Sequence, residues 1–405
     1  MTSRECVLSA LNHRECARIP VDFSGHRSSG IAALAYPRLR RALGLPPAPV
    51  YVYDVIQQLA IVGQDVLDRF GVDTIEMGRG FALRQSDWTD WTLPDGTPCL
   101  VPAWTRIERQ PRRWVIRSAD GKVLAQMPDG ALYFEQTYFP LAEEDGPRTV
   151  RAALDRTMWT AIASPPGPID EDALRAGAQQ LRGSTDKAII GLFGGNLFEI
   201  GHFCYRNDLF MMMLAGEPRK AQAFLDELME IHLEKLDRFL GAVGPFIDII
   251  LFGDDLGMQT GPMISPRMYC EFFKPRHQLL WTRAKELADV KVMLHCCGGV
   301  RELLPHLIEA GLDAINPVQI SCRGMDARAL KAEFGQDLTF WGGGCDTREV
   351  LANATPRQVA EHVRQQVEIF RPGGGFVFQQ VHNILANVPP ENIIAMFDAV
   401  NGQEP

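Results

Sequence analysis

Soft metal ligands follow two apolar segments of the sequence. The segment VKVML runs into HCCGG, which contains His295 and Cys297, and the segment LTFW runs into a glycine run that ends at Cys345. Because side chains alternate along an extended backbone, His295 and Cys297 should share one side and Cys296 should face the other. One nitrogen and two sulfur donors suit Zn2+, and three protein ligands leave a position for a substrate or water. The pattern predicts a zinc site formed by His295, Cys297 and Cys345.

A second interpretation of these residues needs no metal. Cysteine is among the most buried residue types, so a buried histidine beside buried free cysteines would produce the same sequence pattern. The chain has nine scattered cysteines, an odd number, which in a reducing compartment favours free thiols or metal ligands over disulfides. If zinc is bound, its chemistry would be to bind a substrate thiol and lower its pKa, so that the thiol becomes a nucleophile at neutral pH.

Two carboxylates follow a third apolar segment, 247–252. They are Asp254 and Asp255, and we predict that one of them acts in catalysis as an acid, a base or a substrate contact. Only one of the two should face the pocket if the strand continues to them, because neighbouring side chains alternate. Gln259 follows on the same loop and could bind substrate. The alternative is that both carboxylates accept hydrogen bonds from loop amides.

Further substrate-binding candidates lie after two other apolar segments. Asn196 and Glu199 follow the segment 188–193, and His382 follows the segment 375–378. Glu199 shares a predicted helix face with polar residues three and seven positions later. That face could instead be solvated, and His382 could simply bind a backbone carbonyl.

The elements that must position these residues alternate between strands and helices. A helix is predicted to begin at Pro218, another at the Ser265-Pro266 cap, and a third spans 357–370. Alternation of this kind predicts a parallel sheet, and the count of strands approaches that of a (β/α)8 barrel, whose active sites lie at the C-terminal ends of the strands. A doubly wound open sheet is the main competitor. The predicted strands are 19–23, 74–77, 188–193, 247–252, 290–294, 314–316, 338–341 and 375–378.

The region 88–138 has a different texture. Three Asp-Gly pairs, at 95–96, 120–121 and 129–130, separate short β-rich segments, which is a strong hairpin signal. We predict a peripheral antiparallel meander inserted into a single barrel domain that spans 1–405. Tyr53, which precedes this region, is predicted to open a helix.

Composition narrows the function classes. The charge of -9 argues against a nucleic-acid binder, and no apolar run is long enough to cross a bilayer. The N-terminus lacks the apolar core of a secretory signal, so we expect a cytoplasmic protein that acts on a small molecule, without nucleic-acid or membrane partners. The sequence sets no oligomeric state, and a homodimer is one option.

Four stretches of the chain resemble the uroporphyrinogen decarboxylase superfamily, within its corrinoid- and zinc-linked methyltransferase branch. They are RECVLSALNHRECARIPVDF, FGDDLGMQTGPMISPRMYCEFFKPRH, LHCCGG and GGGFVFQQVHNILANVPPENI. The resemblance implies one distorted (β/α)8 barrel with its pocket at the C-terminal face. In the thiol-dependent methyltransferases of this branch an H-x-C motif and a later cysteine bind zinc, and these roles map onto His295, Cys297 and Cys345.

The chain also departs from parts of this pattern. Uroporphyrinogen decarboxylases share an arginine-rich RQAGRY-type segment that grips propionates, whereas FSGHRSSGIAALAY stands here and Arg27 is its only arginine. Decarboxylation of a tetrapyrrole is therefore not expected. No DxHxxG-type segment for vitamin B12 is present, so a methylated corrinoid would come on a separate protein.

Three functional hypotheses follow. The first is a zinc-dependent methyltransferase that moves a methyl group between a corrinoid carrier and a small thiol or other acceptor. The second is a metal-free decarboxylase of a smaller acid, or a demethylase that passes the methyl group to a folate-type pterin. The third is a non-catalytic barrel that binds a corrinoid protein or stores metal.

Overall fold

The protein was analysed as a computed structural model, which describes residues 1–80, 84–163 and 170–403. Its central feature is a parallel sheet of seven strands in the order β17-β16-β15-β14-β11-β10-β3. These strands are β3 (Thr74–Glu76), β10 (Ala188–Gly194), β11 (Ile249–Gly253), β14 (Lys291–His295), β15 (Ala314–Asn316), β16 (Thr339–Trp341) and β17 (Phe376–Val377).

The two edges of this sheet meet through a short extended segment near the N-terminus. Val21 forms a parallel bridge with Phe378, just beyond β17, and its carbonyl accepts a hydrogen bond from the amide of Asp73, just before β3. The segment thus takes the place of an eighth strand and closes the sheet into a (β/α)8-like barrel. The predicted barrel is confirmed, although its first strand amounts to a single bridge.

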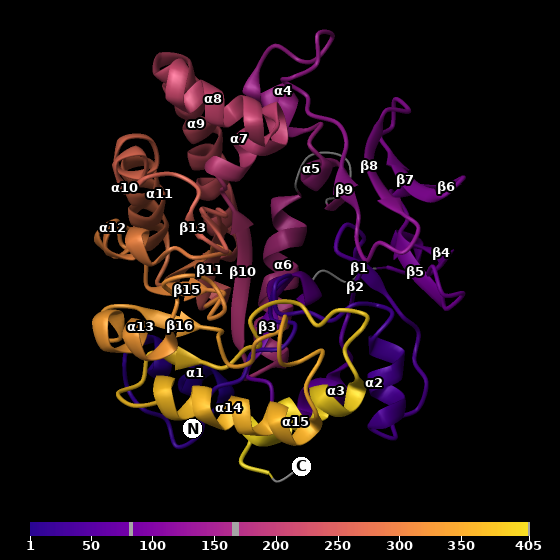
Figure 1. The fold of residues 1–405 in the computed structure, drawn as a ribbon. Coiled ribbons are helices and arrows are strands. Elements are labelled where there is room, and N and C mark those ends of the chain that lie inside the picture. The colour runs from indigo at the N-terminus through magenta and orange to yellow at the C-terminus, as the bar shows by residue number, and fades with distance from the viewer. Residues whose placement is uncertain (81–83, 164–169, 404–405) are drawn as a thin grey trace.

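Helices cover the outside of the barrel and close one end of it (Figure 1). Helix α1 begins with a capping box between Thr2 and Glu5, and its apolar residues Val7, Ala10 and Leu11 pack against side chains that point into the barrel from its strands. Because α1 fills that end, the carboxyl ends of the strands are left to form a site. The helices are α1 (Ser3–Leu11), α2 (Tyr36–Ala42), α3 (Gln64–Arg69), α4 (Val150–Leu154), α5 (Met158–Ala163), α6 (Glu171–Ser184), α7 (Phe198–Tyr205), α8 (Asn207–Gly216), α9 (Pro218–Val243), α10 (Pro266–Met268), α11 (Lys274–Leu287), α12 (Leu304–Glu309), α13 (Ala327–Phe334), α14 (Pro356–Phe370) and α15 (Pro390–Val400).

Antiparallel strands lie to the side of the barrel, opposite α10–α13 in Figure 1. One hairpin pairs β4 with β5, and a separate sheet has the order β6-β7-β8-β9. The three predicted Asp-Gly turns are present, and each glycine has a positive φ. A fourth turn, at Pro111-Arg112 between β6 and β7, was not predicted because it has no Asp-Gly pair. The strands are β4 (Trp88–Thr92), β5 (Pro98–Pro102), β6 (Arg106–Gln110), β7 (Arg113–Arg117), β8 (Val123–Pro128) and β9 (Glu135–Gln136). The division of the chain into one barrel domain with this insertion stays a prediction.

One predicted element is wrong. Tyr53 was expected to open a helix, but it lies in β1 (Val52–Asp54), which pairs with β2 (Leu59–Ala60). The carboxylate of Asp54 accepts a hydrogen bond from the amide of Gln57, so the polar residues there build a turn between two short strands. Two further short strands, β12 (Gly257–Met258) and β13 (Gly261–Pro262), form a small hairpin after β11. None of the helices in the described part of the chain has the length and apolar character needed to cross a membrane.

Candidate metal centre

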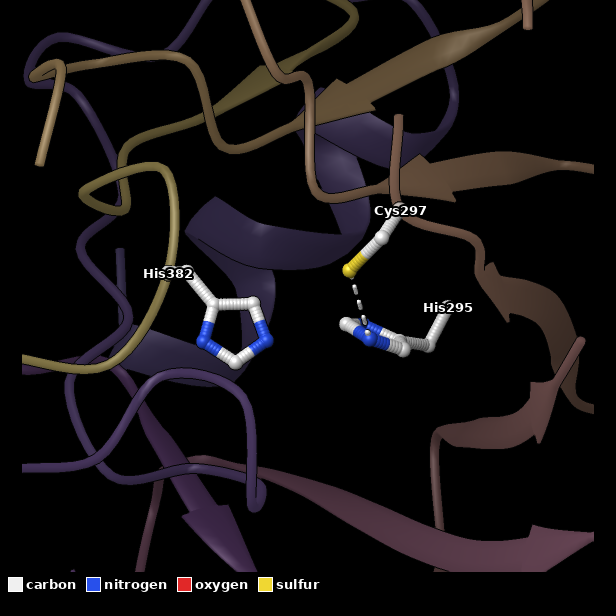
Figure 2. Close-up of side chains that lie close together, drawn as sticks. All are labelled: His295, Cys297 and His382. Carbon is white, nitrogen blue, oxygen red and sulfur yellow. Dashed lines mark hydrogen bonds between the residues drawn. The ribbon is translucent and has the colours of Figure 1, made fainter. Parts of the chain in front are cut away.

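Three side chains that can bind a metal converge at the carboxyl ends of the barrel strands (Figure 2). His295 is the last residue of β14, Cys297 follows two residues later, and His382 comes from the loop after β17. One ligand atom from each lies within 4.8 Å of the others. Sγ of Cys297 is 3.4 Å from Nε2 of His295. Within the described residues, this is the group whose geometry could hold a metal ion.

The backbone around Cys297 is held in place by an acid and by two glycines. The amide of Cys297 donates a 2.7 Å hydrogen bond to Oδ1 of Asp255. Gly298 has φ +91°, and a Cβ there would lie 2.2 Å from the carbonyl carbon of Gly257. Only glycine fits this close crossing of two loops, which explains the glycines that follow the histidine and cysteines in the sequence.

Cys296 lies outside this group. Its side chain is fully buried, and its sulfur accepts a hydrogen bond from the amide of Leu256. Cys345, the third ligand predicted from the sequence, is also fully buried and is not part of the group of three. Cys345 forms a parallel bridge with Gln380. Gln380 lies on the loop that carries His382, so the loop of Cys345 runs beside that loop. Its role as a ligand stays a prediction.

Asp254 and Asp255 point in different directions, as neighbours on an extended segment should. Asp254 is fully buried and accepts hydrogen bonds from the amides of Phe198 (3.0 Å) and Glu199 (2.9 Å) at the start of α7. Its Oδ2 also lies 3.2 Å from Nε2 of His277. Asp255 faces the candidate metal centre, where its side chain is 36% exposed and Oδ1 lies 3.8 Å from Nε2 of His295.

A second carboxyl group lies close to Asp255. Glu199 accepts a 2.6 Å hydrogen bond from the side-chain amide of Asn196. Burial, and next the charges of Asp255 and Asp254, raise the pKa of Glu199 well above its ordinary value and favour the protonated acid. Glu199 can therefore hold or donate a proton beside Asp255, and Asn196 fixes its position through the hydrogen bond.

His382 is the third side chain of the candidate metal centre. Burial, and then the rings of His295 and His26, lower its pKa to about 3. Nδ1 of His382 accepts a 2.8 Å hydrogen bond from the amide of Asn383. Burial and the charge of Asp255 also raise the pKa of the Cys297 thiol, so a thiolate at this position needs a cation beside it.

A cavity of about 330 Å³ opens onto the centre. Its walls carry neutral polar groups and apolar groups, with the exposed side chain of Gln259 at its edge. This volume lies at the lower end of the range for small-molecule sites. The cavity is lined by Gly257, Met258, Gln259, Cys297, Gly298, Gln319, Thr347, Val381 and His382.

Two residues near His295 were not predicted from the sequence. Nδ1 of His295 lies 2.8 Å from Oδ1 of Asn316, and Oγ of Ser28 lies 3.4 Å from Nε2 of His295. Asn316 is the last residue of the predicted strand 314–316. Because the active sites of barrels lie at the carboxyl ends of the strands, Asn316 could have been predicted. Ser28 carried no such signal, because it lies in an irregular loop after the bridge at Val21.

Comparison with known proteins gives one family. The family model described as uroporphyrinogen decarboxylase (URO-D) matches residues 184–403, which include β10 to β17 and the candidate metal centre. Uroporphyrinogen decarboxylases from three Legionella pneumophila strains (Corby, Lens and Philadelphia 1) are each 27% identical to the chain over 146 residues. That match covers 36% of this chain and 39% of each relative.

A solved structure extends the likeness in fold to nearly the whole chain. A methyltransferase from Methanosarcina mazei superposes with a TM-score of 0.60 over 99% of both chains, at 15% sequence identity. At this identity the comparison establishes a shared fold. It includes the N-terminal part, which the family model does not match.

Proposed function

The chain belongs to the uroporphyrinogen decarboxylase family, and from this premise we propose that it is a zinc-dependent methyltransferase. The reaction would move a methyl group from a methylated corrinoid on a separate protein to a small thiol. The thiol would lose its proton and become a thioether, and the cobalt of the corrinoid would keep both electrons of the broken cobalt–carbon bond. The observation that carries the proposal is the convergence of His295 and Cys297 at the mouth of the barrel. The whole-chain likeness in fold to a protein named as a methyltransferase supports it.

The donor atoms fit a zinc ion. Zinc bonds of about 2.0–2.1 Å to nitrogen and about 2.3 Å to sulfur at tetrahedral angles put the two donors roughly 3.5 Å apart. In the structure Nε2 of His295 lies 3.4 Å from Sγ of Cys297. We assign Cys345 as the third ligand, on the sequence pattern. When bound, zinc would lower the pKa of the acceptor thiol so that it reacts as a thiolate.

The residues of the chain would position the acceptor around this centre. Asp255 would hold the loop of Cys297 by accepting a hydrogen bond from the backbone amide of Cys297. Its carboxylate would also accept the proton that the acceptor thiol gives up. Gln259 and the other neutral polar residues of the cavity would bind the polar part of a small acceptor. Holding the acceptor sulfur in line with the methyl carbon is the main contribution that such a site can make.

A decarboxylase of a smaller acid is the second candidate. It is favoured by the decarboxylase relatives and by Glu199, since burial and the charges of Asp255 and Asp254 raise the pKa of Glu199 and suit it to protonate a carbanion. Decarboxylation of a tetrapyrrole is disfavoured by the cavity of about 330 Å³ and by Arg27, which lies 3.5 Å from Asp54 and is thus already paired.

Metal analysis of the purified protein separates the two candidates. We expect a stoichiometric amount of zinc in the wild type and little in Cys297→Ser. Cys99→Ser is the matched control, because Cys99 is buried in β5 outside the centre. A wild type without metal that releases CO2 from a small carboxylic acid would favour the decarboxylase.

A further inference from the structure

A buried amide side chain, Asn316, contacts the ring of His295, and a second buried amide, Gln379, contacts Asn316. Its Nδ1 lies 2.8 Å from Oδ1 of Asn316. The Asn316 amide nitrogen donates to the carbonyl of Trp341 (2.9 Å) and to Oε1 of Gln379 (2.8 Å). Nε2 of Gln379 donates in turn to the carbonyl of Ser28 (3.1 Å). Both amides are fully buried, so water cannot substitute for any of these contacts.

Two backbone carbonyls fix the direction of this chain of hydrogen bonds. The carbonyls of Trp341 and Ser28 can only accept, so the nitrogen of each amide must face them. Asn316 therefore turns its oxygen toward His295. Because an amide oxygen can only accept, Nδ1 of His295 must carry the proton. Nε2 is then the nitrogen that carries the lone pair, and it faces Sγ of Cys297 and Oγ of Ser28.

His382 has the opposite arrangement. Its Nδ1 accepts a hydrogen bond from the amide of Asn383, so in the neutral ring Nε2 carries the proton. Both imidazoles are close enough to contact one ion. Their hydrogen bonds, however, leave a lone pair on Nε2 of His295 and a proton on Nε2 of His382. His382 is prepared to donate a hydrogen bond instead.

We propose that Asn316, oriented by Gln379, is a positioning residue that presents Nε2 of His295 as a metal ligand, while His382 donates a hydrogen bond to the group bound at the metal. The proposal rests on the proposed metal centre. The tautomer of His295, however, is set by the protein alone and can be measured without metal. Groups that orient a metal-binding histidine typically contribute about 10–100-fold in metal affinity.

The first experiment reads the tautomers in the metal-free protein. Histidine is labelled with 15N, and the ring signals are assigned by comparison with His295→Gln and His382→Gln. We expect His295 to carry its proton on Nδ1 and His382 on Nε2, and we expect Asn316→Leu to shift His295 toward a mixture. Wild-type His295 with its proton on Nε2 would overturn the proposal, as would an unchanged tautomer in Asn316→Leu.

The second experiment measures Zn2+ affinity by competition with a chromophoric chelator. Asn316→Leu should weaken binding about 10–100-fold, because the contact that holds the ring of His295 is lost. Asn392→Leu is the matched control, because Asn392 is 1% exposed and donates to two backbone carbonyls away from the centre.

The control separates positioning from general loss of stability. Asn392→Leu should lower the melting temperature without changing zinc affinity. Wild-type affinity in Asn316→Leu, or an equal loss of affinity in Asn392→Leu, would overturn the proposal. A wild type that takes up no zinc would instead refute the proposed function, and the tautomer measurement would then decide the role of Asn316 alone.

Discussion

Replacing Asp254 and Asp255 by asparagine, one at a time, should separate folding stability from turnover. Asp254 is fully buried, and its two oxygens serve two backbone amides of α7 and lie near His277. Asparagine has one oxygen, so its NH2 group would face a backbone N–H and leave a buried donor unpaired. Losing a charge-assisted hydrogen bond and leaving that donor unpaired should together cost about 2–4 kcal/mol of unfolding free energy.

Asp255→Asn should have the reverse profile. The side chain is 36% exposed, and an asparagine oxygen can still accept the hydrogen bond from the amide of Cys297. The loss of unfolding free energy should therefore stay below about 1 kcal/mol. Turnover should fall by more than about tenfold, because asparagine cannot accept the proton that the acceptor thiol gives up.

Urea titration followed by tryptophan fluorescence measures the first quantity, and methyl transfer under conditions where each variant is fully folded measures the second. Equal kinetic losses in Asp254→Asn and Asp255→Asn, with no difference in stability, would refute the assignment of the two carboxylates. An Asp254→Asn variant as stable as the wild type would do the same.

Three further predictions concern other parts of the site. Cys296→Ser should keep its full zinc content, whereas Cys297→Ser and Cys345→Ser should lose most of it, as measured by elemental analysis; equal retention by all three would contradict the ligand assignment. Gly298→Ala should lower both the melting temperature and zinc affinity, since its Cβ would collide with the backbone of the neighbouring loop. Burial lowers the pKa of His202 to about 4. Below about pH 6.5 this histidine is protonated in the unfolded chain but stays neutral in the folded chain. The free energy of unfolding should therefore decrease as the pH falls from about 6.5 to about 4. His202→Phe, which suits the two phenylalanine rings packed on this histidine, should flatten that fall by up to about 3 kcal/mol in urea titrations at pH 4 and pH 7. An unchanged pH dependence would contradict the neutral state of His202 in the folded chain.

Most of the barrel could be predicted because its strands are short apolar runs bounded by glycines and polar residues. The segment 314–316 corresponds to β15 residue for residue, and 188–193 differs from β10 by one residue. The first strand was harder, since Val21 makes only one bridge and its partners lie more than fifty residues away along the chain. Tyr53 was assigned to a helix because neither β1 nor β2 is long enough to show alternation.

The site could be predicted as far as strand ends determine it. His295, Cys297 and Asp255 lie together because neighbouring parallel strands bring their carboxyl ends to one edge. Asn316 ends the neighbouring strand, paired with His295, so its place could have been predicted in the same way. Ser28 reaches His295 only through a tertiary contact, which no local spacing in the sequence encodes. The sequence did not show whether Asp254 or Asp255 faces the pocket. The partners of Asp254 are backbone amides of α7, some 55 residues earlier in the chain.

The most direct test of the central claim is transfer of a 13C-labelled methyl group from methylcobalamin to a small thiol, followed by NMR. Zinc-loaded wild type and Cys99→Ser should form the labelled thioether at equal rates, and Cys297→Ser should form almost none. A zinc-loaded wild type that forms no thioether with any of a panel of small thiols would contradict the account, as would Cys297→Ser turning over at the wild-type rate.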